Sequence, residues 1–171
     1  MNLEEEELIF YKKGSILQCP GDESKMGYWV YKGLLRSYSV DSKGKEHNFM
    51  FAPENWIISD LESIEFHQPS ILFIECMEDS WVKKIQRQFI LQPSELHSGQ
   101  NETIRLLARR VGVLQRRVLM LMSAPARERY LYFLDTYPEL THRLSLKHIA
   151  SYLGITPEAL SKIRRELVKT T

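Results

Sequence analysis

The sequence has few cysteines and no long apolar run. Its two cysteines, Cys19 and Cys76, are too few for a disulfide framework or a cysteine-ligated metal site, so we expect two partly buried thiols without a redox role. No apolar run approaches the ~20 residues that a membrane helix needs. The acidic start MNLEEEELIF does not fit a secretory signal. These absences predict a cytoplasmic protein without a membrane partner.

The sequence also lacks the short motifs of common enzymes. Its histidines, at positions 47, 67, 97, 142 and 148, show neither H-x-H nor H-E-x-x-H spacing, so we predict no metal site. It contains no Gly-x-Ser-x-Gly nucleophile turn and no glycine-rich loop that would cradle a phosphate. We therefore predict that the protein is not an enzyme and has no resident cofactor.

Charge is distributed unevenly along the chain. Residues 1–95 carry 16 acidic and 10 basic side chains, whereas residues 96–171 carry 6 acidic and 13 basic ones. A basic half is compatible with a polyanionic partner, although exposed helices are often arginine-rich for solubility alone.

Short apolar segments separated by turn signals dominate residues 8–91. The segments YWVYKGLLRSYSV and NFMFA are typical of strands, with the polar turn DSKGKEH between them, and SILFIEC is typical of a buried strand. Turn signals recur at KKG, PGDES, APEN and HQPS. Residues 1–94 are therefore predicted to form an antiparallel β-sandwich or roll.

The pattern becomes helical after Pro93. Six apolar residues are spaced 3, 4, 3, 4 and 3 apart, as in the seam of a coiled coil: Ile104, Leu107, Val111, Leu114, Val118 and Leu121. This stripe would suit packing on the β-domain or pairing with a second copy. Because it is narrower than a stripe that covers a globular core, we favour pairing and predict a dimerisation helix over residues 95–122.

A second, smaller helical domain is predicted over residues 123–171. Ser123 is expected to cap a helix over residues 125–136, whose side chains Tyr130, Leu131, Phe133 and Leu134 enter a small core.

The segment LSLKHIASYLGITPEALSKIRREL, residues 144–167, predicts two short helices that cross closely. With Leu146 as position 1, Ala150 at position 5 supplies the small side chain, and Gly154 at position 9 supplies the positive φ of the turn. Five apolar residues are spaced to face inward: Ile149, Leu153, Ile155, Leu160 and Ile163. The pattern favours a helix-turn-helix unit over an ordinary helical hairpin.

The second helix of this unit has an outward face suited to DNA. We predict Thr156 as its N-cap and Pro157 as its first residue. Glu158 can accept a hydrogen bond from cytosine and Lys162 can donate to guanine. Thr156, Ser161 and Arg165 suit phosphates, and Lys147 and His148 on the preceding helix could clamp the DNA backbone. Each residue alone could equally be a solvated surface side chain.

The order of these parts resembles the Crp–Fnr family of transcription regulators, and above all its short members from Bacteroidetes-type bacteria. The resemblance is most specific in residues 144–167, and it extends to YKKGSILQCPGDES and VYKGLLRSYSVDSKGKEHNFMF of the family's cyclic-nucleotide-binding β-roll. It implies an α+β fold: an N-terminal antiparallel β-roll of the jelly-roll or double-stranded β-helix type, a long dimerisation helix and a C-terminal winged-helix-like helix-turn-helix. It also implies a homodimer that binds a near-palindromic operator, with RNA polymerase as a candidate partner.

Two departures from the family limit what is carried over. The family's recognition helix has an Arg-Glu pair and a second Arg, where this sequence has Pro157, Glu158 and Lys162, so the operator sequence is not predicted. The family's effector pocket uses a Gly-Glu-Leu turn and an Arg-Ser pair, where this sequence has Ser59, Asp60 and Leu61, and Pro69 and Ser70. Without the arginine a cyclic phosphate loses its bidentate partner, so we predict that cyclic AMP is not a tight ligand. The effector is then either another small molecule or absent. The competing hypothesis is a β-roll that binds a small molecule or a protein and has no specific DNA binding.

Overall fold

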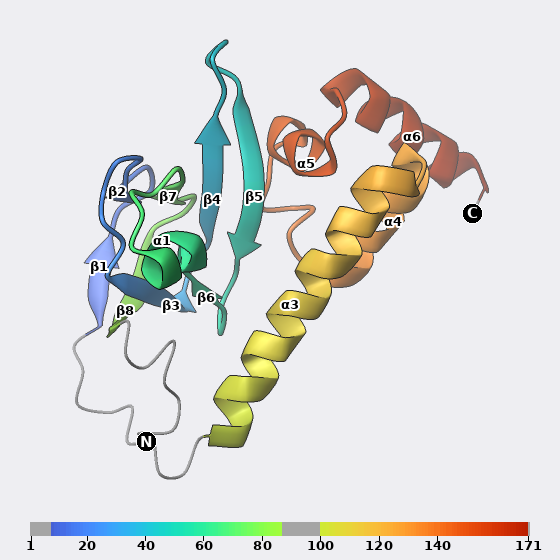
Figure 1. The fold of residues 1–171 in the computed structure, drawn as a ribbon. Coiled ribbons are helices and arrows are strands. Elements are labelled where there is room, and N and C mark those ends of the chain that lie inside the picture. The colour runs from blue at the N-terminus through green and yellow to red at the C-terminus, as the bar shows by residue number, and fades with distance from the viewer. Residues whose placement is uncertain (1–7, 87–99, 171) are drawn as a thin grey trace. The chain divides into compact units, whose positions relative to one another are not determined.

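The computed structural model describes residues 8–86 and 100–170, and it describes no side chain for residues 100–107, 110 and 170. The chain divides into two compact units, Met1–Arg105 and Leu106–Thr171 (Figure 1). The predicted boundary between the β-domain and the long helix, at residues 94 and 95, lies outside the described residues.

The N-terminal unit contains two antiparallel sheets of four strands each (Figure 1). Its strands are β1 Ile9–Tyr11, β2 Ile16–Gln18, β3 Met26–Lys32, β4 Leu35–Val40, β5 Glu46–Ala52, β6 Ile57–Ile58, β7 Phe73–Cys76 and β8 Ser80–Gln86. The strand orders are β1-β8-β3-β6 and β2-β7-β4-β5, so strands distant in sequence pair in both sheets. The predicted antiparallel β-roll is confirmed.

The core of this unit is built by alternate residues of the two sheets. Because successive side chains of a strand point to opposite faces, one face of each sheet can be wholly apolar. The first sheet contributes Val30, Ile58 and Val82, and the second contributes Leu35 and Ile74, all fully buried in one apolar cluster.

Gly33 ends strand β3 at a place that only glycine suits. Its φ is +107°, and a Cβ atom there would lie 2.3 Å from Ser80 Oγ and 2.8 Å from the carbonyl oxygen of Asp79. The chain therefore crosses from the first sheet to the second, between β3 and β4, directly against the start of β8. Gly33 lies inside the segment YWVYKGLLRSYSV, which was predicted to form strands.

The two cysteines differ sharply in exposure. Cys19 is exposed, whereas Cys76 is fully buried on β7 and burial raises the pKa of its thiol to about 11. The prediction of two partly buried thiols is therefore wrong for both residues.

We expect one fast-reacting thiol per chain at pH 8, because the thiolate is the reactive form and Cys76 stays protonated and enclosed. Reaction with a disulfide reagent should release one equivalent from the folded protein and a second only in denaturant. The variant Cys19→Ser should remove the fast phase; two fast equivalents in the folded protein would contradict the burial of Cys76.

In the described residues, the C-terminal unit is built from helices alone. These are α3 Gln100–Ser123, α4 Ala126–Thr136, α5 Leu146–Leu153 and α6 Pro157–Thr170. The described range 100–170 contains the predicted helix-turn-helix without strands of a wing.

An aromatic cluster forms the centre of this unit. Phe133 of α4 is fully buried, and its ring centroid lies 5.5 Å from that of Tyr137 and 5.6 Å from that of Tyr152 on α5. Tyr130 is also buried, as predicted, but Leu131 is exposed.

Ser123 does not cap α4. Its Oγ donates to the carbonyl oxygen of Leu119 at 2.8 Å, so Ser123 ends α3, and Pro125 occupies the N-cap position of α4 without a side-chain hydrogen bond. The predicted start of the helix is right, but the predicted cap is wrong.

Candidate nucleic-acid interface

Helices α5 and α6 are joined by a tight turn at Gly154. Gly154 has a φ of +66°, and its amide donates to the carbonyl of Ser151, while the amide of Ile155 donates to the carbonyl of Ala150. Ala150 is almost fully buried in the described structure. The positive φ and the buried small side chain are the two features that the spacing predicted.

Most residues predicted to face inward between α5 and α6 are buried. Ile149, Leu153, Leu160 and Ile163 are buried, and Ile155 is half-buried. Tyr152 is also buried and packs edge-on against Tyr137, with 5.8 Å between ring centroids. A tyrosine is not expected at an inward position from apolar spacing alone, so the sequence pattern missed it.

The N-terminus of α6 is capped as predicted. The Oγ1 of Thr156 accepts a hydrogen bond from the amide of Ala159 at 3.2 Å. Hydrogen bonds from the Glu158 amide and from the Thr156 hydroxyl hold the pKa of the Glu158 carboxyl below its usual value. Glu158 is therefore a fixed carboxylate acceptor at the start of the helix.

The outward face of α6 carries the residues predicted to contact DNA. Thr156, Pro157, Glu158, Lys162 and Arg165 are exposed, and Ser161 is half-buried. They lie away from Leu160 and Ile163, which face the core. The structure therefore gathers the residues that were predicted to read bases and bind phosphates on one solvent-facing side of the helix.

The N-terminus of α5 adds two more polar groups. Ser145 caps the helix, and its Oγ accepts from the amide of His148 at 3.3 Å and lies 3.0 Å from His148 Nδ1. This contact orients the imidazole at the helix N-terminus. Lys147 is exposed beside it.

The predicted dimer seam lies along α3. Val111, Val118 and Leu121 are 60%, 55% and 42% exposed, which is unusual for three apolar residues in heptad spacing, and Leu114 is half-buried. Ile104 and Leu107 lie in the same helix, but their side chains are outside the described residues. The C-terminal half of the seam is thus an apolar stripe in contact with solvent.

The predicted effector pocket is occupied by the protein's own side chains. Asp60 caps α1, Leu61–Phe66, by accepting from the amide of Ser63 at 3.1 Å, and it also accepts from Ser70 Oγ at 2.6 Å. Gln18 Nε2 donates to Ser70 Oγ at 2.8 Å. Ser24 completes a closed circuit, because its hydroxyl donates to Gln18 Oε1 at 2.8 Å and its amide donates to Ser63 Oγ at 3.1 Å.

All five residues of this circuit are buried, and Asp60 is only 3% exposed. Ser59 is buried as well, its Oγ has no hydrogen-bond partner among residues 8–86 and 100–170, and Leu61 is half-buried. The structure therefore brings Asp60 and Ser70 together, as the resemblance predicted, but they bind each other. Helix α1 itself was missed, since six residues are too few to show a helical period.

Within the described residues, no three histidine, cysteine or acidic side chains gather where they could hold a metal ion. Over the same part of the chain, every helix is too short or too polar to span a membrane.

We compared the chain with known proteins and solved structures. No protein-family model matches the chain. A fumarate and nitrate reduction regulatory protein from Vibrio cholerae is 26% identical over 164 residues; the match covers 89% of this chain and 65% of that protein. The chain thus spans slightly less than two thirds of the length of this curated relative.

Two solved structures share the fold. FixK2 from Bradyrhizobium japonicum has a TM-score of 0.77 at 19% identity, over 96% of this chain and 85% of that chain. A CRP/FNR-family transcriptional regulator from Thermus thermophilus, TTHA1359, has a TM-score of 0.71 at 19% identity, over 96% of this chain and 87% of that chain. The β-roll and the helix-turn-helix unit define the class of two-part proteins to which these structures belong. The chain shares the fold of these regulators.

Proposed function

We propose that the protein is a cytoplasmic, dimeric transcription regulator that binds a near-palindromic DNA operator. The observation that carries this proposal is the free outward face of α6, where a capped helix N-terminus presents Glu158, Lys162 and Arg165 beside the turn at Gly154. The named regulators to which the chain is similar support the same function. RNA polymerase is included as a candidate partner because the family resemblance implies it.

The roles within this face follow from chemistry. The Glu158 carboxylate would accept from a cytosine amino group, and Lys162 would donate to guanine in the major groove. Thr156, Ser161 and Arg165 would bind phosphates and fix the register, and Lys147 and His148 would add phosphate contacts from the N-terminus of α5.

Pairing along α3 would supply the symmetry that a near-palindrome requires. The stripe of Val111, Val118 and Leu121 has the apolar surface for this, and its burial between two copies removes that surface from water. Two recognition helices would then lie about 34–36 Å apart, one turn of DNA.

The hydrogen-bonded circuit around Asp60 bears on whether the β-roll can bind a cyclic nucleotide. A cyclic nucleotide would place its phosphate anion beside the Asp60 carboxylate, with no guanidinium to balance either charge. We therefore propose that this region is a structural replacement of the family's effector pocket and that cyclic AMP is not its ligand.

The proposed function is tested by mobility shifts on genomic upstream fragments across a salt series. A regulator should lose affinity steeply with salt and should prefer its operator over unrelated DNA by roughly 10³-fold or more. Salt dependence without selectivity would support the competing hypothesis, a β-roll module with only a generic basic surface.

Two substitutions on α6 should separate base reading from phosphate binding. Lys162→Ala should relax the preference at one base pair, costing about 1–3 kcal/mol of discrimination, whereas Arg165→Ala should weaken all sequences alike and lower the salt slope by about 1. Binding to a library of operator variants at several salt concentrations distinguishes the two outcomes. If both variants lose affinity uniformly, Lys162 does not read a base.

A further inference from the structure

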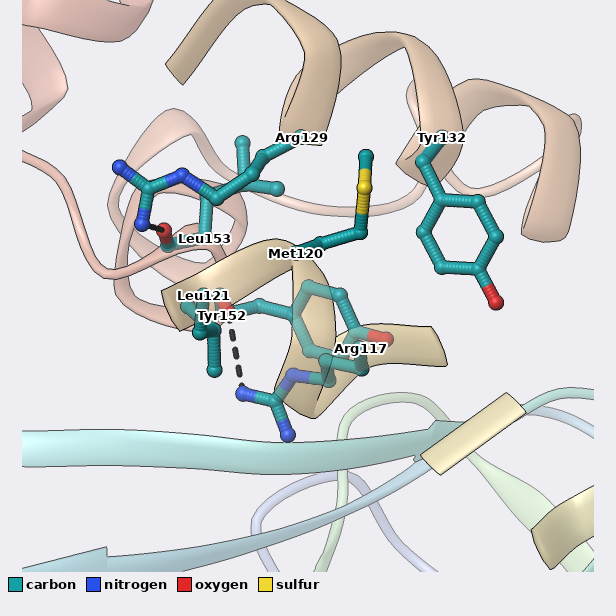
Figure 2. Close-up of a pocket in the computed structure, with 7 residues that line it drawn as sticks. All are labelled: Arg117, Met120, Leu121, Arg129, Tyr132, Tyr152 and Leu153. Carbon is teal, nitrogen blue, oxygen red and sulfur yellow. Dashed lines mark hydrogen bonds between the residues drawn. The ribbon is translucent and has the colours of Figure 1, made fainter. Parts of the chain in front are cut away.

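Two half-buried arginines converge on the C-terminus of α5. Arg117 Nη2, from α3, donates to the carbonyl oxygen of Tyr152 at 3.0 Å, and Arg129 Nη1, from α4, donates to the carbonyl oxygen of Leu153 at 2.8 Å (Figure 2). The last carbonyls of a helix have no partner within the helix and carry its negative end. Cations from two other helices therefore cap α5, immediately before the turn into α6.

Arg117 is anchored in the core of the unit. Its guanidinium carbon lies 4.1 Å from the centroid of the Tyr152 ring, and that ring packs on Phe133 and Tyr137. Burial lowers the pKa of Arg117 from its usual value, as expected for a cation withdrawn from water. A side chain held in this way is not available to a DNA phosphate.

The space between the two arginines is too small for a ligand. Arg117, Met120, Leu121, Arg129, Tyr132, Tyr152 and Leu153 line a cavity of about 10 Å³ (Figure 2). Such a volume holds at most one water molecule. The guanidinium groups therefore connect α3 and α4 to the end of α5 and do not form a ligand site.

The turn itself is packed against the same two helices. A Cβ atom on Gly154 would lie 3.4 Å from Leu121 Cδ2 of α3 and 3.5 Å from Arg129 Nη1 of α4. Leu121 is also a member of the predicted dimer seam, and Arg117 directly precedes Val118 of that seam. The residues that would pair two copies and those that hold the turn are thus interleaved on the last two turns of α3.

We propose that Arg117 and Arg129 are positioning residues that fix the turn at Gly154, and with it α6, to the end of α3. The proposal deepens the proposed function, since it explains how pairing along α3 would set the distance between two recognition helices. Without the two guanidinium bonds, α6 would keep its DNA-contacting face but lose its fixed direction relative to the dimer axis.

The test compares Arg117→Met, which keeps the apolar stem and removes the donors, with Arg116→Met on the same helix. Arg116 is exposed, and its guanidinium lies 5.9 Å from the Tyr132 ring. The measurement is the ratio of affinities for two operators, one with the best separation between half-sites and one with that separation changed by one base pair. For Arg117→Met this ratio should fall roughly tenfold, while the dependence of affinity on salt stays unchanged. Arg116→Met should keep the full preference for the best separation. Arg117→Lys, which retains a cationic donor, should keep most of that preference. Equal losses on all separations by Arg117→Met would overturn the proposal.

A second measurement needs neither DNA nor a dimer. Spin labels at Gln115→Cys on α3 and Arg164→Cys on α6, both exposed positions, in a Cys19→Ser background report the distance between the helices within one chain. Labelled chain diluted in unlabelled chain should give a narrow distance distribution with Arg117 present and a broad one with Arg117→Met. An unchanged distribution in a folded variant would refute the positioning role. If the unsubstituted protein shows no selective DNA binding, the proposed function fails, and the distance distribution still decides the role of Arg117.

Discussion

Val118→Lys should convert the protein to monomers and lower its affinity for a palindromic operator about 10²–10⁴-fold, the gain that linking two binding modules typically provides. Val118 is 55% exposed in the centre of the described part of the seam, so lysine can be accommodated in a single chain. Across a two-fold axis, however, each lysine would face its own copy in an apolar interface, where an unpaired charge is costly. Sedimentation equilibrium and operator titration should therefore change together.

The matched control is Leu119→Lys. Leu119 is 53% exposed and neighbours Val118, but it lies outside the heptad positions. This variant makes the same chemical change on the same helix and should remain dimeric with nearly full affinity. A monomeric Val118→Lys variant that binds the palindrome as tightly as the unsubstituted protein would refute the coupling between pairing and DNA binding. Dimers in both variants would show that α3 pairs through another face or not at all.

The helix-turn-helix unit was predictable because its constraints are local. Gly154 needs a positive φ, Ala150 must be small, and Thr156 must cap the next helix, and each requirement is visible within a few residues of sequence. The antiparallel roll was predictable for a similar reason, since alternation and turn residues mark each strand separately. Features that depend on one short segment with its own residue preferences can thus be read from the chain.

The arginine pair was not predictable from the same signals. Arg117 lies off the apolar seam of α3, and an arginine there is ordinarily expected to be exposed. Its position depends on Tyr152, 35 residues later, whose ring lies under the guanidinium and whose carbonyl oxygen accepts from it. Neither residue signals the other in one sequence. A clue is that Tyr152 interrupts the apolar positions of α5 with a residue that needs a polar or cationic neighbour when buried.

The hydrogen-bonded circuit in the β-roll was also not predictable from local sequence. Resemblance identified Asp60 and Ser70 as pocket positions, and the structure indeed places them 2.6 Å apart. Their involvement with Gln18 and Ser24 depends on contacts over as many as 52 residues of sequence, which no local pattern encodes. The family resemblance therefore gave the location of these residues, and the structure shows that they are hydrogen-bonded to one another.

Asp60→Ala should destabilise the β-roll by about 2–4 kcal/mol. The substitution removes the cap of α1, which is the bond from the Ser63 amide and is typically worth about 0.5–2 kcal/mol. It also takes from the buried Ser70 hydroxyl its shorter acceptor bond, leaving the Leu72 carbonyl at 3.1 Å, at a cost of about 1–3 kcal/mol. Asp60→Asn keeps one acceptor oxygen for the Ser63 amide and should lose about 1 kcal/mol or less. All three tryptophans, Trp29, Trp56 and Trp81, lie in the N-terminal unit, so tryptophan fluorescence during urea unfolding reports on this unit alone.

The same unfolding curves decide whether the circuit has replaced an effector. A ligand present at 100 times its dissociation constant would raise the stability of the folded state by about 2.7 kcal/mol. Millimolar cyclic AMP should leave the fluorescence midpoint of the unsubstituted protein unchanged, because its phosphate would have to displace the Ser70 bond and then lie beside the Asp60 carboxylate. Asp60→Asn removes that charge while keeping the cap, so it is the variant most able to admit an anion.

A midpoint raised by cyclic AMP in the unsubstituted protein would show that the circuit opens for a ligand. Asp60 would then control access to a ligand site and would not replace the ligand. A midpoint raised only in Asp60→Asn would show that the carboxylate alone excludes the nucleotide.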